Sequence, residues 1–309
     1  MELPIIKYRF VFFLLSGVLV LVSIVSLAVF RLQFGLEFTG GSLLEMTFTQ
    51  ERPPSENIRE ALKETELGAL TIQAAGDKNV VLRFKNVDEP THQKVLEKLK
   101  TLGEGEEQRF TTIGPVIGEE LRRTGVTAVG LGLLAILLYI AWAFRKVSRP
   151  VPSWQYGFIA AAVAMFHDVV IPLGAFSLLG KFRGEEIGVP FIAALLTILG
   201  FSVHDTIVVF DRTRENLRRY AGEEFSHIVH RSTNQTIGRS LATSFTVLAT
   251  IAVIYVLGGE TIRSFALALF IGIALGTYSS IFVASPLLVE FQKMRMPKFR
   301  ISRPRFRRR

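Results

Sequence analysis

Residues 203–215 read VHDTIVVFDRTRE, and they close an apolar run that opens at Ile187. The stretch ends in a dense group of charges, whereas His204 and Asp205 lie roughly 1.5 helical turns inside the last apolar residue, Phe210. An aspartate near the centre of a bilayer costs about 2.5 to 3.5 kcal/mol on insertion scales, so it normally faces a partner, a water cavity or an ion path. Asp205 is therefore the first candidate for a functional residue.

The composition is that of a membrane protein with several spans. The chain has 309 residues, of which 49% are hydrophobic, and its mean hydropathy is +0.37; both exceed what a soluble core of this length needs. The net charge of +9 comes from basic residues at the ends of apolar runs and in the tail after Lys293. That placement is typical of membrane topology and not of nucleic-acid binding. Because there is no cysteine, disulfides, thiolate metal sites and a cysteine nucleophile are excluded.

The first apolar run, 10–30, is uncharged and long enough to span a membrane as a helix. It is longer than the core of a signal peptide, which has about 7 to 15 residues, and no A-x-A cleavage site closes it. We therefore expect an uncleaved span that follows a short cytoplasmic N-terminus, 1–9.

Residues 31–123 contain no apolar run of membrane-spanning length, and we expect them to form a water-exposed α+β domain on the outer side of the membrane. Helical spacing of apolar residues follows Pro53 and Pro90. Strand-like patterns occur at 42–49, 69–73, 80–84 and 108–113. The resulting order βαββαβ is the ferredoxin-like arrangement, which hosts many functions and identifies none.

Further apolar runs predict a polytopic α-helical membrane protein with six transmembrane helices. The predicted spans are 10–30, 124–144, 154–180, 189–210, 234–258 and 264–289. Basic residues in a short loop at Arg145, Lys146 and Arg149, in the loop 211–233 and in the tail 290–309 then all lie on the cytoplasmic side, with both termini.

Two further patterns concern the packing of these helices. Within the loop 211–233, an amphipathic helix pair at 215–220 and 225–231 is expected at the membrane face. The pair Gly272 and Gly276 either marks a close-packing face between helices or reflects the ordinary small-residue content of membrane helices.

Three ionisable residues within the predicted spans are candidates for proton coupling: Asp168, Asp205 and Arg239. If the fifth helix starts near Asn234, Arg239 lies roughly one to two turns inside the membrane, which is the depth of Asp205. A carboxylate that faces an arginine stays ionised, and it takes up a proton when a helix movement removes the arginine. The alternative is a fixed interhelical ion pair with a purely structural role.

The histidines His204 and His167 each precede one of these aspartates and are candidate proton relays, because imidazole titrates near neutral pH. Structural hydrogen bonding is the alternative role for both. A metal site is not expected, since two separated His-Asp pairs make a thin ligand set. An intramembrane protease is not expected either, because Ser202 and Asp205 are sequence neighbours, whereas a triad requires convergence in space with an oxyanion site.

Four motifs, in order along the chain, resemble those of a known family. They are GLEFTGG at 35–41, FHDV at 166–169, VHDTIVVFDR at 203–212 and QTIGRSLATS at 235–244. Together they resemble the SecF branch of the SecD/SecF family of protein-export subunits, relatives of the resistance-nodulation-division transporters. The family positions in the first motif are Gly35, Glu37, Phe38, Gly40 and Gly41, with Glu37 where the family more often has aspartate.

The resemblance implies a non-enzymatic subunit of the cytoplasmic membrane of a bacterium that partners SecD and assists the SecY channel in a late step of preprotein export. It implies that the proton motive force supplies the energy, with protons as the coupling ion and no cofactor. It also places Asp205 and Arg239 at the positions linked to proton coupling. The chain contains no SecD-like segment, so SecD is expected to come from another chain. The unfolded preprotein and the lipid bilayer are the remaining partners, and nucleic acid is not one.

Two other function classes stay open at this point. An exporter of small molecules or lipids from the same superfamily usually has two exported domains and about twice as many spans, which argues against that class. A structural assembly factor without proton coupling would keep the fold and give Asp205 and Arg239 a structural role.

Overall fold

The structure, a computed structural model, describes residues 3–144 and 163–295. The chain divides into two compact units. The helical unit comprises Met1–Leu32, Val129–Glu185 and Pro190–Arg309, and the sheet unit comprises Gln33–Ala128 and Glu186–Val189.

Within the described residues, six helices are long and apolar enough to cross a membrane. They include the helices α1 (Arg9–Phe30), α5 (Pro115–Ala143), α7 (Phe166–Arg183), α8 (Val189–Arg219), α9 (Phe225–Leu257) and α10 (Glu260–Ser279). The third candidate span is Val163–Arg183 and the sixth is Ile262–Lys293. The predicted fold class is therefore confirmed. Residues 154–162 of the third predicted span, the basic residues Arg145, Lys146 and Arg149, and the tail from 296 lie outside the described residues.

The helix α5 begins earlier than predicted, at Pro115 instead of 124. Proline is favoured in the first turn of a helix because its missing N–H would have no partner there and its φ is already helical. The polar residues that follow it, among them Glu119 and Arg122, therefore form the first turns of the same helix and not a separate loop.

Residues 215–219 and 225–231 are helical as predicted, but the predicted separate loop at 211–233 is wrong, because both segments continue the membrane helices. The helix α8 continues through this region to Arg219, and α9 already begins at Phe225. Phe210 of α8 and Val229 of α9 are both buried in one hydrophobic cluster, and Val229 lies outside the predicted spans. The buried Asn216 also donates hydrogen bonds of 2.9 Å to α9, so the two helices stay paired up to their turn.

The last predicted span, 264–289, is interrupted. A π-helical segment, Ser280–Ala284, separates α10 from the helix α11 (Ser285–Arg295). The second residue of α11 is Pro286, which has no N–H and cannot donate to the preceding turn. A π-helical turn at this point accommodates the missing hydrogen bond.

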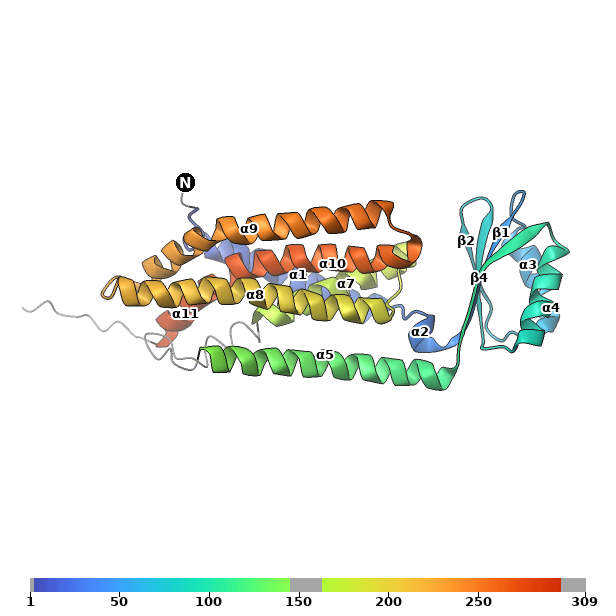
Figure 1. Cartoon of the computed structure of the whole chain (residues 1–309), viewed down its shortest axis with the longest axis horizontal. Helices are drawn as coiled ribbons and strands as arrows, with labels where there is room; N and C mark the ends of the chain where they lie inside the picture. The colour runs from blue at the N-terminus through green and yellow to red at the C-terminus, as the bar shows by residue number, and fades with distance from the viewer. Residues whose placement is uncertain (1–2, 145–162, 296–309) are drawn as a thin grey trace, which may run out of the picture. The chain divides into compact units, whose positions relative to one another are not determined.

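The helices pack closely at their small residues. A Cβ atom added at Gly272 would lie 2.2 Å from the Ile198 side chain, and one at Gly276 would lie 2.9 Å from Ser202. The glycines therefore let α10 approach α8, so that of the two alternatives left open by the sequence the structure has the close-packing face. Figure 1 shows α8, α9 and α10 running alongside one another.

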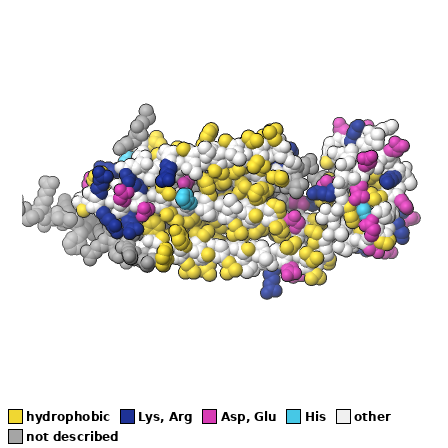
Figure 2. All heavy atoms as spheres, in the orientation of Figure 1, with side chains coloured by type: hydrophobic (Ala, Val, Ile, Leu, Met, Phe, Trp, Pro, Cys, Tyr) yellow, Lys and Arg dark blue, Asp and Glu magenta, His cyan; other side chains and the backbone are white. Residues whose placement is uncertain are grey.

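Charged and hydrophobic side chains occupy different parts of the helical unit. Figure 2 shows hydrophobic side chains covering the visible face of the helices, whereas Lys and Arg gather at the end where α8 and α9 are joined. The arginines of that connection are Arg212, Arg214, Arg218, Arg219 and Arg231. An apolar surface between polar ends is typical of helices that cross a membrane.

The sheet unit has the predicted βαββαβ order. Its strands are β1 (Gly41–Phe48), β2 (Thr71–Ala75), β3 (Asn79–Phe84) and β4 (Gly105–Ile113), in the spatial order β2-β3-β1-β4 with every pair antiparallel. The helices α3 (Ser55–Ala61) and α4 (Glu89–Lys100) cover one face of the sheet (Figure 1). The core between the two layers contains fully buried side chains, including Leu44, Ile58, Leu82, Val95 and Leu99.

Candidate functional site

The carboxyl group of Asp168 lies at the meeting point of three helices and is 0% exposed. Ser202 of α8 and Ser279 of α10 both donate hydrogen bonds to its Oδ2, the second over 2.9 Å. The Nδ1 atom of His167 lies 2.8 Å from its Oδ1. Both oxygens of Asp168 are thus engaged, as buried carboxylates require.

The imidazole of His167 is 3% exposed and stacks on the ring of Tyr278, with 6.1 Å between ring centroids. The Tyr278 hydroxyl donates a 2.9 Å hydrogen bond to the Phe12 carbonyl of α1. The Nε2 atom of His167 is buried and has no hydrogen-bond partner among the described residues. His167 therefore extends the polar cluster of Asp168 towards α1 and retains one unused polar atom.

The second intramembrane carboxylate, Asp205, is 4% exposed and faces α9. Ser240 donates a 3.1 Å hydrogen bond to its Oδ1. Its Oδ2 is buried without a hydrogen-bond partner in the part of the chain that the structure describes. A buried carboxylate oxygen without a hydrogen-bond partner is energetically costly in a dry interior. The hydrogen-bonding capacity of this oxygen of Asp205 is therefore not satisfied.

The pair of Asp205 with Arg239 is not formed in this structure. Arg239 is exposed, and the described residues contain no ion pair between the two side chains. The reason is the helical register: adjacent positions point about 100° apart, and α9 turns Ser240, one residue further on, towards Asp205. His204 is also exposed, since its neighbour Asp205 occupies the inward position of α8.

Hydroxyl side chains form interhelical hydrogen bonds beside the two carboxylates, and the sequence analysis did not identify them. Thr206, next to Asp205, lies 2.8 Å from the Ser280 hydroxyl, which donates to the carbonyl of Ser202, a partner of Asp168. The hydroxyl groups of serine and threonine in an apolar helix can also donate hydrogen bonds to backbone carbonyls of the same helix. Their presence in the sequence therefore does not indicate a partner on another helix. The available signal is spacing: Ser202 and Thr206 lie one helical turn apart on the buried face of α8.

The Gly35–Gly41 motif forms the entry to the sheet. A short helix, α2 (Leu36–Thr39), buries Phe38 and leads directly into β1. Gly40 and Gly41 have φ values of +68° and +120°, which L-residues with side chains rarely adopt. A Cβ atom at Gly41 would also lie 2.7 Å from the carbonyl oxygen of Phe84 in β3. The two glycines are thus required by backbone conformation and close approach.

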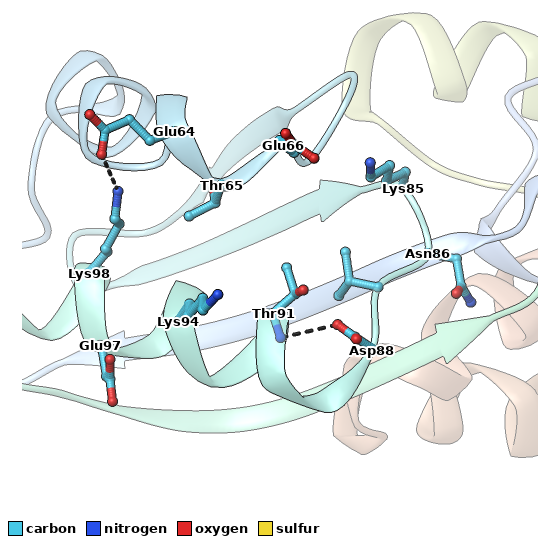
Figure 3. A pocket seen from close by; sticks show the side chains of 11 residues that line it. Glu64, Thr65, Glu66, Lys85, Asn86, Asp88, Thr91, Lys94, Glu97 and Lys98 are labelled. Atoms are coloured by element: carbon cyan, nitrogen blue, oxygen red, sulfur yellow. Dashed lines mark hydrogen bonds and ion pairs between the residues drawn. The ribbon is translucent and has the colours of Figure 1, made fainter.

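One pocket on the sheet unit is lined by acidic and basic side chains. It has a volume of about 630 Å³ and contains both signs of charge, with an ion pair of 3.1 Å between Lys98 and Glu64 at its edge (Figure 3). The Thr91 amide donates a hydrogen bond to the Asp88 carboxylate, which caps α4. Hydrogen bonding by the Thr91 side chain, and then by this amide, holds the pKa of Asp88 below its ordinary value. The lining residues are Glu64, Thr65, Glu66, Lys85, Asn86, Val87, Asp88, Thr91, Lys94, Glu97 and Lys98. With acids and bases interspersed, the pocket presents no field of one sign to a ligand.

Within the described residues, no group of three or more His, Cys, Asp or Glu side chains is placed to hold a metal ion. The arrangement instead supplies what a proton site needs: a buried carboxylate with one free oxygen, a buried imidazole with one free nitrogen, and hydroxyl groups between helices.

Comparison with known proteins agrees with this architecture. Residues 92–294 match the family described as protein export membrane protein SecD/SecF, C-terminal. Residues 25–51 match the SecD/SecF GG motif. These two matches include the glycine motif and all of the intramembrane candidates.

Individual relatives are similar over nearly the full length. The chain is 44% identical to the protein translocase subunit SecF of Thermobaculum terrenum, with 94% of each chain covered. It is 39% identical to that of Desulfurispirillum indicum, with 93% of this chain and 91% of the relative covered. It is also 37% identical to the protein translocase subunit SecDF of Brucella abortus, covering 94% of this chain but 37% of the relative.

A solved structure extends the likeness to three dimensions. The crystal structure of SecDF, a translocon-associated membrane protein from Thermus thermophilus, matches with a TM-score of 0.81 and 32% identity. The match covers 95% of this chain and 39% of the solved chain, so this chain spans about two fifths of that larger protein. Both the sequence and the fold lead to one conclusion: the chain is a multi-pass membrane protein that belongs to the SecD/SecF family of bacterial protein-export membrane proteins.

Proposed function

We propose that the chain is a non-enzymatic accessory subunit of the Sec preprotein translocase that uses the proton motive force, together with SecD, to promote late steps of export. It acts in the cytoplasmic membrane, with both termini in the cytoplasm and the sheet unit outside. Support comes from the relatives, which are named protein translocase subunits. The basic end of the helical unit supports the orientation, because Lys and Arg favour the cytoplasmic side.

We propose SecD as the partner within the membrane and the SecY channel and the unfolded preprotein as the partners in export. Support for SecD comes from the longer relatives named SecDF, of which this chain matches 37% and 39%. A partner fused to a related sequence in one protein is a natural candidate for a separate subunit in another.

The observation that carries the proton-coupling proposal is the unsatisfied Oδ2 atom of the buried Asp205. When this carboxyl group binds a proton, the charge is removed and the neutral group keeps its hydrogen bond to Ser240. When the group is ionised, a rotation of α9 by about 100° would replace Ser240 with Arg239 as its partner. Proton binding and release then select between two positions of α9 against α8.

The other intramembrane candidates have different roles in this proposal. Asp168 is fully engaged with Ser202, Ser279 and His167, so it anchors α7 to α8 and α10. His167 has a free Nε2 and serves as a proton relay to that cluster. His204 is exposed, and its place in this proposal is at the entry to the site.

The proposal predicts the behaviour of Arg239→Met. The variant loses the cation that stabilises ionised Asp205, so a proton gradient should no longer stimulate export. The measurement is export of a reporter preprotein into vesicles that contain this chain, SecD and the SecY channel, with and without an imposed gradient. Arg218→Met, at the exposed end of α8, is the matched control and should respond as the wild type does. Equal stimulation of wild type and Arg239→Met, at equal assembly, would contradict the coupling role.

A further inference from the structure

The short segment that leads into α8 is held against the start of the glycine motif by one parallel β-bridge. Phe34 and Ile187 are the bridge partners, and residues 186–189 belong to the sheet unit. The Gly35 amide donates to the Ile187 carbonyl over 2.9 Å, and the Ile187 amide donates to the Gln33 carbonyl over 2.8 Å. The side chain of Ile187 is buried.

The carboxylate of Glu37, in the glycine motif, satisfies the beginning of α8. The amide of Val189, the first residue of that helix, donates a hydrogen bond to Glu37 Oε2. The first N–H groups of a helix have no partner inside it, and its N-terminus favours negative charge. A glutamate at this place in the motif therefore contributes both an acceptor and a charge of the correct sign.

An ion pair completes the attachment. Arg83 on strand β3 contacts the Glu186 carboxylate, and both side chains are partly buried. Burial lowers the pKa of Arg83, and the neighbouring Glu45 opposes this effect. We call Gly35, Glu37, Arg83, Glu186 and Ile187 the α8 anchor.

We propose that Glu37 and Arg83 are positioning residues that fix the beginning of α8 to the sheet, so that a displacement of α8 relative to α9 is passed to the exported unit. The inference rests on the proposed function, because Asp205 lies on the same helix. Sixteen residues separate Val189 from Asp205 (205 − 189), or about 24 Å of continuous helix. The preceding segment contains Gly184 and Gly188, and without the anchor this glycine-containing loop would absorb the displacement.

The contacts are tested first by hydrogen exchange on the full chain in lipid nanodiscs, which requires no export activity. Glu37→Ala should accelerate exchange in the peptide that contains Ile187 and Val189 about tenfold, whereas Glu37→Gln, which retains an acceptor oxygen, should change it less. Unchanged exchange in Glu37→Ala would overturn the anchor itself.

The transmission role is tested by covalent rescue, because the chain has no cysteine of its own. Glu37→Ala combined with Arg83→Ala should reduce the ratio of export with and without a gradient to about one. Adding Phe34→Cys and Ile187→Cys, the bridge partners, should restore the ratio after oxidation and lose it again after reduction. Lys98→Ala with Glu64→Ala, an exposed ion pair on the same unit, is the matched control and should keep the wild-type ratio.

The outcomes distinguish a failure of the proposed function from a failure of the α8 anchor. If the wild type shows no stimulation, the proposed function is wrong, and the exchange result still decides whether the anchor exists. If the wild type is stimulated and the double variant is stimulated equally, the transmission role is overturned. If oxidation forms the cross-link without restoring the ratio, Glu37 and Arg83 act otherwise than by positioning α8.

Discussion

Replacing Gly41 with alanine is expected to lower the free energy of unfolding of the sheet unit by about 3 kcal/mol. The φ of +120° is nearly inaccessible to alanine, and the new Cβ would lie 2.7 Å from the Phe84 carbonyl oxygen. Ser42, the next residue, pairs with Phe84 in the β1–β3 ladder, so the strand cannot move away without losing its register. Amide exchange of β1 and β3 in the full chain should become roughly a hundredfold faster.

The matched control for this prediction is Gly114→Ala, at the same end of the sheet, where Gly114 follows Ile113, the β4 partner of Gly41. Its φ is not positive, and no atom lies within 4 Å of the added Cβ. Its effect should stay within about 0.5 kcal/mol. If Gly41→Ala and Gly114→Ala exchanged at the same rate, the structural reason given for the glycine pair would be wrong.

Replacing Asp168 with leucine is expected to destabilise the helical unit by about 3 to 5 kcal/mol. Ser202, Ser279 and His167 would all lose their shared acceptor in a buried position. The measurement is thermal unfolding of the full chain in detergent. Asp168→Asn should be milder, because it keeps one acceptor oxygen at the same place.

Thr197→Ala is the control for the helical unit. Thr197 is exposed on α8 and bonds only to the carbonyl of Ala193 in its own helix, so its loss should change stability by less than about 0.5 kcal/mol. If Asp168→Leu were as stable as Thr197→Ala, the hydrogen-bonded cluster would not be what holds α7 to α8 and α10.

The sequence was sufficient to predict the helices and strands but not the residues at which several of them begin and end. Long apolar runs predict membrane helices, and the alternation in 42–49 and 80–84 predicts β1 and β3, because these patterns follow directly from burial. A helix at 215–220 was predicted, but its continuity with α8 through 211–214 was not predictable in this way. It depends on contacts such as that of Asn216 with Ser232, sixteen residues away, and not on the polarity of the segment itself.

In the candidate site, the sequence identified the buried polar residues but not which side chains face one another. The polarity of Asp168 and Asp205 inside apolar runs identified them, and both are buried. Which neighbour of Asp205 would face it was not readable, since Arg239 and Ser240 differ by one position on α9 and only the rotation of that helix decides between them. The contact of Glu37 with Val189 joins residues 152 positions apart, and neither residue alone signals it.

The most direct test of proton coupling is the response of Asp205→Asn to an imposed gradient in the reconstituted export assay. Asparagine keeps the shape and the hydrogen bond to Ser240 but cannot be ionised. We predict that the gradient stimulates export by the wild type and by Ser240→Ala, which keeps the carboxyl group, and that it does not stimulate export by Asp205→Asn at equal assembly. Equal stimulation of Asp205→Asn and the wild type would contradict the account and would leave Asp205 a structural residue.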